Sequence, residues 1–387
     1  MTGAASRVVG QDGILRAGWQ PALDGHLQMS EGGLPTRRRL PTCPTLDLSG
    51  HLVLPGLINA HDHLEFNLFP QLGRGPYPNA GEWARDIYRP DRSPIREHLR
   101  VPKAVRLWWG ALKNLLSGVT TVCHHNPFEQ DVFGADFPVC VVRRFSWAHS
   151  LEFEPELAAR FRKAPPTYPF LVHCAEGADA TARRELQCLD ELGALDQRTA
   201  IVHGVGITAA GLALMRQRRA SLVWCPTSNL AMLGRTVSRA VLRSGIPMAL
   251  ATDSALSAPV DLLDELAVAR KFLPPARLYE MVTSGPARIL RLPRSRRDWI
   301  AIRTDARTPA EALFEAAIAL VVVAGRIRLI SPDLARQLPS SARRRLQLLR
   351  VENRPPVLVD ADVRQLHRAA AKHLGQDLRL AGKRIFQ

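Results

Sequence analysis

Two histidines separated by one residue follow the first strongly apolar run of the sequence. The run 52–58 leads within a few residues to His61, Asp62 and His63. Side chains alternate between the two faces of a β-strand, so His61 and His63 are predicted to share one face while Asp62 points to the other. Two neutral imidazoles at the end of a strand can chelate one metal ion. Taken alone the pair is weak evidence, because surface or core histidines often have the same spacing.

The same interruption of apolar runs by polar residues recurs three more times. The runs 170–172, 200–202 and 248–252 end in His173, His203 and Asp253, and Glu176 follows His173 by three residues. Core packing alone does not explain metal-binding or proton-transferring residues at four strand ends. The carboxyl ends of barrel strands meet at one face, where active sites are built. Three imidazoles with one carboxylate suit zinc or iron and leave a coordination position for water.

The elements that must position these residues alternate between short apolar runs and amphipathic segments. This alternation predicts an α/β fold with parallel strands, and the number of units favours a (β/α)8 TIM-type barrel. Seven strands can be counted, so a barrel that is distorted or one strand short is the alternative, and residues 145–149 are the candidate for the missing strand. The expected strands are 52–58, 119–123, 139–142, 170–172, 200–202, 222–224 and 248–251, and the expected helices are 101–116, 157–163, 178–192, 208–217 and 260–272.

Both ends of the chain are expected to lie outside the barrel. Residues 1–50 together with 291–332 are predicted to form a small composite β-sandwich domain, with strands near 13–17, 46–50, 298–302, 320–323 and 326–330. Residues 51–290 form the predicted metal-dependent hydrolase barrel. Residues 333–387, rich in Leu, Arg and Ala, are expected to be a C-terminal helical extension.

The composition is that of a globular protein, with 46% hydrophobic and 23% charged residues among 387. The formal charge of +16 invites a nucleic-acid partner, but only six of the 52 basic residues are Lys and the Arg residues are scattered. We interpret this bias as the codon usage of a GC-rich genome and expect no nucleic-acid partner. The six Cys form no C-x-x-C pair, no apolar signal core follows the N-terminus, and the run 316–324 is too short for a bilayer. We therefore expect a cytoplasmic protein without membrane association.

Several short motifs occur in a fixed order along most of the chain. Together they resemble the amidohydrolase superfamily, in its mononuclear deaminase and chlorohydrolase-like branch. The resemblance covers residues 46 to about 330. The motifs are LPGLINAHDH at 54–63, GVTT at 118–121, HCAE at 173–176, LGAL at 192–195, IVHG at 201–204, CPTSNL at 225–230 and ATDS at 251–254.

The resemblance implies a role for each polar strand end. It makes His61, His63, His173 and Asp253 the ligands of one divalent metal ion, with zinc first and iron(II) as the alternative. It makes Glu176 the proton shuttle and His203 the group that polarises or anchors the reacting centre, while Asp253 also orients the hydroxide; Glu176, His203 and Asp253 are then the catalytic residues. From the residues alone, Glu176 can equally cap the following helix, and His203 can be a structural donor.

The implied reaction is the hydrolysis of a non-peptide C–N bond, with an aminohydrolase (deaminase) of a nitrogenous heterocycle as the leading hypothesis. No Lys stands at a strand end, which argues against the branch with a carbamate-bridged pair of metals. A cyclic amide, a guanidine-type bond or a carbon–halogen bond is the alternative target. A non-catalytic metal-binding relative and a nucleic-acid binder remain as further alternatives. The partner is then a small-molecule substrate, and the family often forms homodimers.

The substrate contacts are the least defined part of the prediction. By alternation Glu65 and Asn67 share the face of His61 and His63, and either can equally be a solvated loop residue. His124 and His125 end the second strand, and one of them is expected to point inward. The substrate candidates are Glu65, Asn67, His125 and Trp147, and the strand-end loops that would set specificity also carry Trp83 and His149. Asp62 stands where related enzymes often carry a small or apolar residue.

Overall fold

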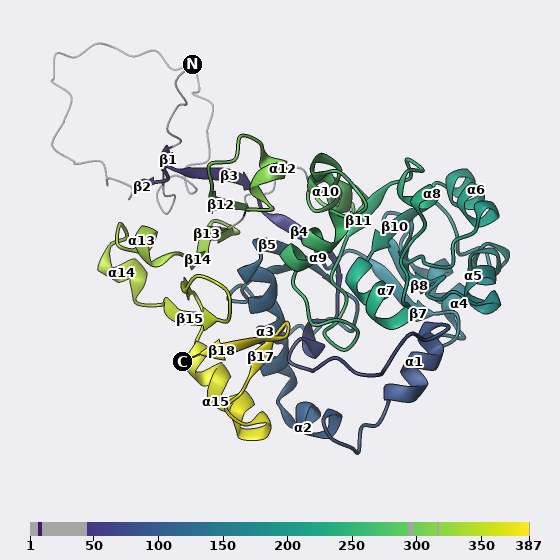
Figure 1. The fold of residues 1–387 in the computed structure, drawn as a ribbon, viewed down its shortest axis with the longest axis horizontal. Coiled ribbons are helices and arrows are strands. Elements are labelled where there is room, and N and C mark those ends of the chain that lie inside the picture. Colours follow the sequence, from purple (N-terminus) through teal and green to yellow (C-terminus); the bar gives the residue numbers. More distant parts are fainter. Residues whose placement is uncertain (1–6, 10–44, 294–297, 316, 387) are drawn as a thin grey trace, which may run out of the picture.

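Parallel strands followed by helices form the larger part of the molecule. The structure is a computed structural model that describes residues 7–9, 45–293, 298–315 and 317–386 (Figure 1). Its parallel strands pair in two sheets, with the orders β4-β5-β6 and β11-β10-β9-β8-β7. These strands are β4 (Leu57–Asp62), β5 (Val119–His124), β6 (Cys140–Val141), β7 (Ser146–Ser150), β8 (Phe170–Cys174), β9 (Thr199–His203), β10 (Ser221–Trp224) and β11 (Met248–Leu250).

The run 145–149 forms the additional parallel strand, β7, which pairs with β8. The described part of the chain therefore contains eight parallel strands rather than seven. β11 ends beside β4, because the backbone amide of Asp253 donates to the carbonyl oxygen of His61 at 3.2 Å. No ladder joins β6 to β7 within the described residues, so the strands form a three-stranded and a five-stranded sheet. The predicted α/β class with parallel strands is confirmed.

The apolar run 52–58 is split between two sheets, which differs from the single strand expected. β3 (His51–Pro55) pairs antiparallel with β12 (Trp299–Arg303), whereas β4 starts at Leu57 and pairs parallel with β5. Gly56 lies between them, and a Cβ at this position would be only 2.2 Å from the Thr120 hydroxyl oxygen. The chain can change sheets here because glycine lets the backbone approach β5 closely.

Amphipathic helices cover the parallel strands, as the periodicity predicts. α3 is one example: Trp109, on its buried face, is fully enclosed. Most helix ends lie within two residues of the expected ones. α9 is shorter at both ends than the expected helix 260–272, because Asp261 caps its start and the chain turns at Arg270. The helices that follow the strands are α3 (Lys103–Leu116), α4 (Leu157–Lys163), α5 (Ala180–Glu191), α6 (Ala209–Arg218), α7 (Pro226–Leu233), α8 (Arg239–Leu242), α9 (Leu262–Ala269), α10 (Pro275–Met281) and α11 (Ser284–Ile289).

Eight of the other described strands form one antiparallel sheet rather than the expected sandwich. Its order is β17-β18-β15-β16-β14-β13-β12-β3. Residues 333–387, expected to be helical, supply α15 (Val363–Leu374) but also four of these strands, because segments such as QLLRV alternate polar and apolar side chains. The strands of this sheet whose bounds have not yet been given are β13 (Ala317–Val323), β14 (Arg326–Ile330), β15 (Gln347–Val351), β16 (Val357–Val359), β17 (Arg379–Leu380) and β18 (Lys383–Phe386).

The N-terminal region is described only in part. β1 (Arg7–Val9) pairs antiparallel with β2 (Thr45–Asp47), close to the strand expected at 46–50. The strand expected at 13–17 lies outside the described residues. Four further short helices lie in the loops and in the C-terminal region: α2 (Ile95–Arg100), α12 (Pro309–Ala312), α13 (Pro332–Ala335) and α14 (Ser340–Arg343).

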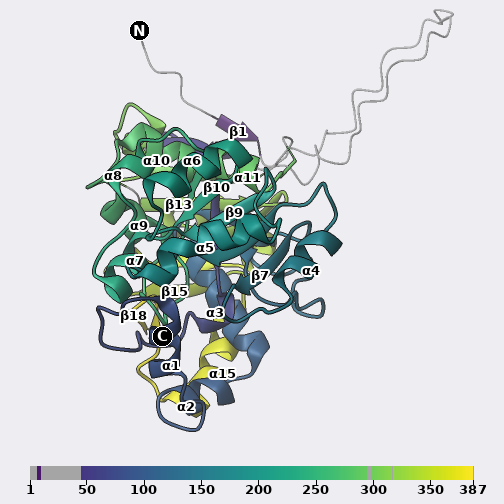
Figure 2. The same cartoon turned by 90° about the vertical axis from the view of Figure 1, so that its right-hand side faces the viewer.

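The antiparallel sheet and the C-terminal helix pack against the helices that cover the parallel strands (Figures 1 and 2). The indole nitrogen of Trp109 on α3 donates to the carbonyl oxygen of Leu366 on α15 at 3.4 Å. The Asp261 carboxylate, just before α9, forms ion pairs with Arg354 and with Lys383 near the C-terminus. Among the described helices, none combines the length and the apolar character needed to cross a bilayer.

Candidate active site

The predicted polar residues gather at the carboxyl ends of the parallel strands. His61 lies near the end of β4, His173 near the end of β8, and His203 ends β9. The backbone turns sharply there: Ala175, His203 and Asp253 have φ values of 55°, 74° and 60°. Non-glycine residues rarely adopt this left-handed conformation, which is found mainly at functional strand ends and turns. The strand ends are thus shaped to present side chains rather than to continue the sheet.

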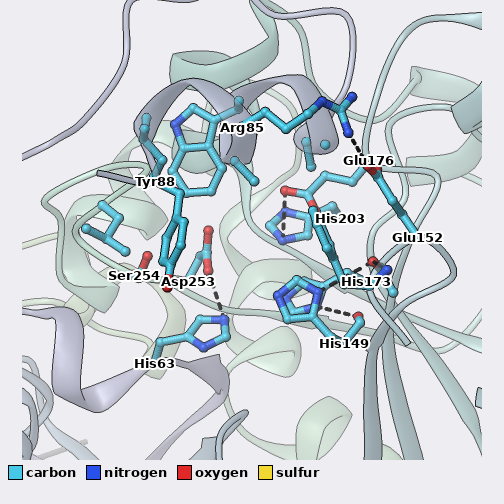
Figure 3. Close-up of a pocket in the computed structure, with 18 of the residues that line it drawn as sticks. His63, Arg85, Tyr88, His149, Glu152, His173, Glu176, His203, Asp253 and Ser254 are labelled. Atoms are coloured by element: carbon cyan, nitrogen blue, oxygen red, sulfur yellow. Dashed lines mark hydrogen bonds and ion pairs between the residues drawn. The ribbon is translucent and has the colours of Figure 1, made fainter. Parts of the chain in front are cut away.

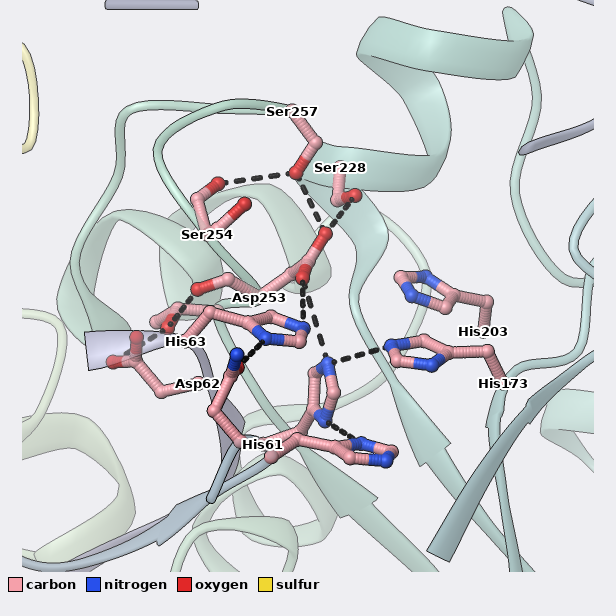
Figure 4. A network of polar contacts seen from close by, with 12 residues as sticks. His61, Asp62, His63, His173, His203, Ser228, Asp253, Ser254 and Ser257 are labelled. Atoms are coloured by element: carbon pink, nitrogen blue, oxygen red, sulfur yellow. Dashed lines mark hydrogen bonds and ion pairs between the residues drawn. The ribbon is translucent and has the colours of Figure 1, made fainter. Parts of the chain in front are cut away.

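Four side chains converge on one point. The Nε2 atom of His61 lies 3.4 Å from Asp253 Oδ1 and 3.2 Å from His173 Nε2. His63 Nε2 lies 3.6 Å from the same Asp253 oxygen. Figure 4 shows the three imidazoles and the carboxylate facing one another. As the alternation predicts, His61 and His63 share this face while Asp62 points away from it.

The hydrogen-bond partners fix which nitrogen of each imidazole is free. His173 Nδ1 donates to the carbonyl oxygen of His149 at 2.7 Å, and His63 Nδ1 donates to the Asn126 side-chain oxygen. His125 Nε2 donates to the Ala148 carbonyl oxygen, so its Nδ1 is an acceptor for His61 Nδ1 at 3.0 Å. All three candidate ligands therefore turn an unprotonated Nε2 toward the common point. Such outer hydrogen bonds are typical of metal-binding histidines.

Burial gives these groups the protonation states that a cation requires. It lowers the pKa of His61 to about 4 and the pKa of His173 well below 6.5. Burial raises the pKa of Asp253, but its contacts with His61, His203 and His63 more than offset this and hold it well below 3.8. The second Asp253 oxygen accepts hydrogen bonds from Ser228 and Ser257 at 2.7 and 2.6 Å. Three neutral imidazoles and one ionised carboxylate fit a divalent ion such as zinc.

Glu176 and His203 form a second pair beside the converging ligands. His203 Nδ1 donates to the Asn229 side-chain oxygen at 2.9 Å, so its Nε2 faces Glu176 Oε1 at 3.3 Å as an acceptor. Burial, with the charges of Asp253 and Glu185, raises the pKa of Glu176 well above 4.5. Burial also lowers the pKa of His203. A carboxyl group with a raised pKa beside a neutral imidazole can accept and return a proton near neutral pH.

A cavity of about 660 Å³ opens above these residues (Figure 3). His63, His173, Glu176, His203 and Asp253 form its floor. The opposite wall is mostly apolar and comes largely from α1 (Ala80–Ile87) and the loop after β7. An ion pair at the rim joins Arg85 of this helix to Glu152 of that loop. The apolar wall residues include Phe66, Trp83, Ile87, Tyr88, Phe153 and Leu256.

The four predicted substrate contacts lie outside this cavity wall. Glu65 accepts from His124 and from Asn126, and Asn67 donates to Asp62 at 2.8 Å. The alternation on which they were chosen stops at His63, because a 3-10 turn, η1 (Leu64–Phe66), follows. His125 supports His61, and the Trp147 ring packs on His125 with 5.1 Å between centroids. The geometry favours support of the metal ligands over contact with substrate for all four.

The other residues of the site were only partly predictable from the sequence. Of the loop residues named for specificity, Trp83 and His149 do line the cavity. The serines that hold Asp253 come from the CPTSNL motif and from the loop after ATDS, so those motifs were the available signal. Three contributors lie on segments where nothing distinguishes them from ordinary helix or loop residues: Asn126, Glu185 and Lys113.

Comparison with known proteins agrees with this geometry. The amidohydrolase family model matches residues 170–295, which include His173, Glu176, His203 and Asp253. Over these residues the chain is similar to the amidohydrolase family. Curated proteins similar to this chain include the 5-methylthioadenosine/S-adenosylhomocysteine deaminases of Pyrococcus furiosus and Halobacterium salinarum. They are 27% and 28% identical to it, over 66% and 64% of this chain and 74% and 70% of theirs.

Solved structures show the same fold. A zinc-bound adenosine deaminase from Xanthomonas campestris is 21% identical, with a TM-score of 0.61 over 84% of this chain and 85% of its own. An atrazine chlorohydrolase from Arthrobacter aurescens, complexed with zinc, is 16% identical, with a TM-score of 0.63 over 84% and 88%. The chain therefore shares its fold with enzymes of more than one named activity.

Proposed function

We propose that this protein is a metal-dependent aminohydrolase that releases ammonia from a nitrogenous heterocycle. The observation that carries the proposal is the Glu176–His203 pair, at 3.3 Å, beside the point where three Nε2 atoms and Asp253 converge. A bound divalent ion would lower the pKa of a coordinated water molecule toward about 7. The deaminase names of the curated relatives support the same reaction class.

Each side chain of the site has its own role in the proposed reaction. Asp253, held by two serine hydroxyls, is fixed as a carboxylate that can orient an attacking water. In its ionised form Glu176 takes a proton from that water, and as the carboxylic acid that its raised pKa favours it passes the proton to a ring nitrogen of the substrate. His203, fixed by Asn229, offers a hydrogen-bonding Nε2 to the reacting group. The apolar wall on α1 excludes water from the face of the ring opposite the floor.

The finer points of the proposal follow from the same arrangement. We infer that the two parallel sheets are the halves of a (β/α)8 barrel, with 51–290 as its domain and both chain ends outside it. Zinc is the proposed metal, with iron(II) as the alternative, because imidazole and carboxylate ligands suit both. A small-molecule substrate, a cytoplasmic location, a homodimer and the absence of a nucleic-acid partner remain parts of the proposal.

An ammonia-release screen over purines, pyrimidines, pterins and triazines, with metal content measured on the same sample, tests this function. We expect about one divalent ion per chain and activity that a chelator abolishes and zinc restores. Glu176→Gln should lower kcat by about 10²- to 10⁴-fold while the bound metal is retained, whereas the exposed Glu156→Gln should leave both unchanged. Chloride or another leaving group released without ammonia would instead favour the carbon–halogen alternative. A protein without stoichiometric metal would contradict the whole proposal.

A further inference from the structure

A buried ion pair lies directly behind the converging ligands. The Lys113 ammonium on α3 is 2.8 Å from Asp62 Oδ2, and the exposed fractions of the two side chains are 1% and 0%. Taking two charges out of water costs several kcal/mol per ion. A pair of well-packed apolar side chains would often be at least as stable at such a position. Stability alone therefore does not explain these two residues.

Neutral polar groups complete the hydrogen bonding of the pair. Asn114 donates to Asp62 Oδ2 at 2.7 Å, and Asn67 donates to Asp62 Oδ1 at 2.8 Å. Lys113 Nζ donates to the Thr252 hydroxyl oxygen at 3.0 Å. We call Asp62, Lys113, Asn114, Asn67 and Thr252 the buried ion-pair network. With partners on both sides of the carboxylate, the network has a defined geometry rather than a loose association.

The network connects the two chain segments that carry three of the four candidate ligands. Asp62 lies between His61 and His63, so holding its side chain also fixes the backbone that presents both imidazoles. Thr252 directly precedes Asp253, and its backbone amide donates to the Asn59 side chain at 3.2 Å. α3 supplies Lys113 as the bridge between them (Figure 4 shows Asp62 turned away from the site).

We propose that Asp62 and Lys113, acting through Thr252, are positioning residues that set the distance between the histidine pair of β4 and Asp253. They touch neither substrate nor metal, and they act through the backbone of the ligands. The proposal rests on the metal site of the proposed function. Its test therefore measures metal binding itself, without substrate.

The double variant Asp62→Asn/Lys113→Met removes both charges and keeps side chains of similar size. Zinc affinity is measured by competition with a chromophoric chelator, and ligand geometry by the visible absorption of the cobalt(II)-loaded protein. We expect zinc affinity to fall about 10- to 100-fold, as for other groups that orient ligands, and the cobalt bands to change in position or intensity. A wild-type affinity and spectrum in the folded double variant would overturn the proposal.

A matched control removes another buried ion pair that is far from the site in the fold. Arg328 on β14 is 2.9 Å from Asp360, and their side chains are 2% and 9% exposed. Arg328→Met/Asp360→Asn should leave zinc affinity and the cobalt spectrum unchanged. If this control weakened zinc binding as much as the test variant, the effect would be general destabilisation and the proposal would fail.

Thr252→Val provides a second test that changes one hydroxyl for a methyl group. The variant keeps both charges and nearly the same volume, but it removes the oxygen that joins Lys113 to the Asp253 segment. We expect zinc affinity to fall several-fold, with the cobalt spectrum shifted in the same sense as in the double variant. An unchanged affinity and spectrum here would also overturn the proposal. Wild-type protein that binds no metal would contradict the proposed function instead.

Discussion

Glu185 lies behind the loop that carries Glu176. Its Oε2 accepts a hydrogen bond from the backbone amide of Ala175 at 2.5 Å. Burial, followed by the charges of Asp179 and Glu152 and despite the Ala175 hydrogen bond, raises the pKa of Glu185 to about 7. A carboxyl group whose pKa is raised on folding stabilises the native state below its unfolded pKa of 4.5, and this stability is lost as the pH rises through about 7.

Glu185→Gln should therefore change the pH dependence of stability. The amide oxygen can still accept from Ala175, but the variant escapes the cost of ionising a buried carboxyl group. Relative to wild type, its free energy of unfolding should rise by up to about 3 kcal/mol between pH 4.5 and pH 8. Urea unfolding of the metal-free proteins at both pH values measures this difference, with the exposed Glu156→Gln as the control. Parallel pH dependences for variant and wild type would contradict the prediction.

Among single residues, the sequence could identify those whose spacing matches the alternation of side chains along a β-strand. Alternation placed His61 and His63 on one face, and motif order brought in His173, Glu176, His203 and Asp253. The same alternation misled for Glu65 and Asn67, because the chain leaves the strand at His63 and turns through η1. Lys113 could not be recognised, because one Lys in an amphipathic helix ordinarily faces solvent. Only the packing of α3 against η1 and β5 shows that Lys113 meets Asp62.

Among the elements, α1 and the loop after β8 are joined along their backbones. The Ala80 amide donates to the Glu176 carbonyl oxygen at 2.9 Å, and Asn79 and Gly177 form an isolated antiparallel bridge. A Cβ at Gly177 would lie 2.7 Å from the Asn79 Cβ and 2.8 Å from the Pro78 carbonyl oxygen. The helix that lines the cavity is thus joined through the backbone to Glu176, the proposed proton shuttle.

Gly177→Ala should separate these two segments and displace Glu176. We expect kcat to fall on the order of 10- to 100-fold, because displacements of about 1 Å at a reacting group have effects of this size. Bound metal should stay at the wild-type level, since no candidate ligand is moved. Steady-state kinetics with metal analysis measures both quantities. Gly134→Ala, where a Cβ would meet nothing within 4 Å, is the matched control; equal kinetics in both variants would refute the coupling.

The elements themselves were largely predictable, and the errors have local causes. The strong apolar runs and helix periodicities gave most strands and helices. The split at Gly56 was hidden, because β3 and β4 are both apolar and nothing in the run marks a change of sheet. β7 contains His149, two serines and Trp147, so it was only a candidate strand. Four C-terminal strands were missed because they are short, with two to five residues each.

Across the whole molecule, ion pairs join the C-terminal strands to the part of the chain that carries the parallel strands. Asp261 is 4% exposed, caps α9 and is paired with Arg354 and Lys383, which come from the far end of the chain. Such non-local contacts cannot be read from composition or periodicity. The sequence therefore predicted a barrel with appended ends but not how those ends attach.

Arg354→Ala/Lys383→Ala should destabilise the protein by about 3 kcal/mol or more, because it leaves the Asp261 carboxylate buried without a countercharge. Urea unfolding followed by circular dichroism measures the loss. The exposed pair of Arg384 and Asp377, at 2.9 Å on the same hairpin, offers a control. Arg384→Ala should cost less than about 1 kcal/mol. A double variant as stable as this control would show that the C-terminal strands are not held through Asp261.

The left-handed residues at the strand ends have a consequence for how such a protein can change over generations. Ala175 holds φ 55° one position before Glu176, a conformation that costs an alanine about 1 kcal/mol and a glycine almost nothing. Replacement by glycine would relieve that cost in the native state while freeing the segment that aims the carboxyl group. Glycine also gives the unfolded chain more conformational freedom, which offsets most of that gain in stability. The alanine therefore restrains the segment that aims Glu176 at almost no net cost to the stability of the fold.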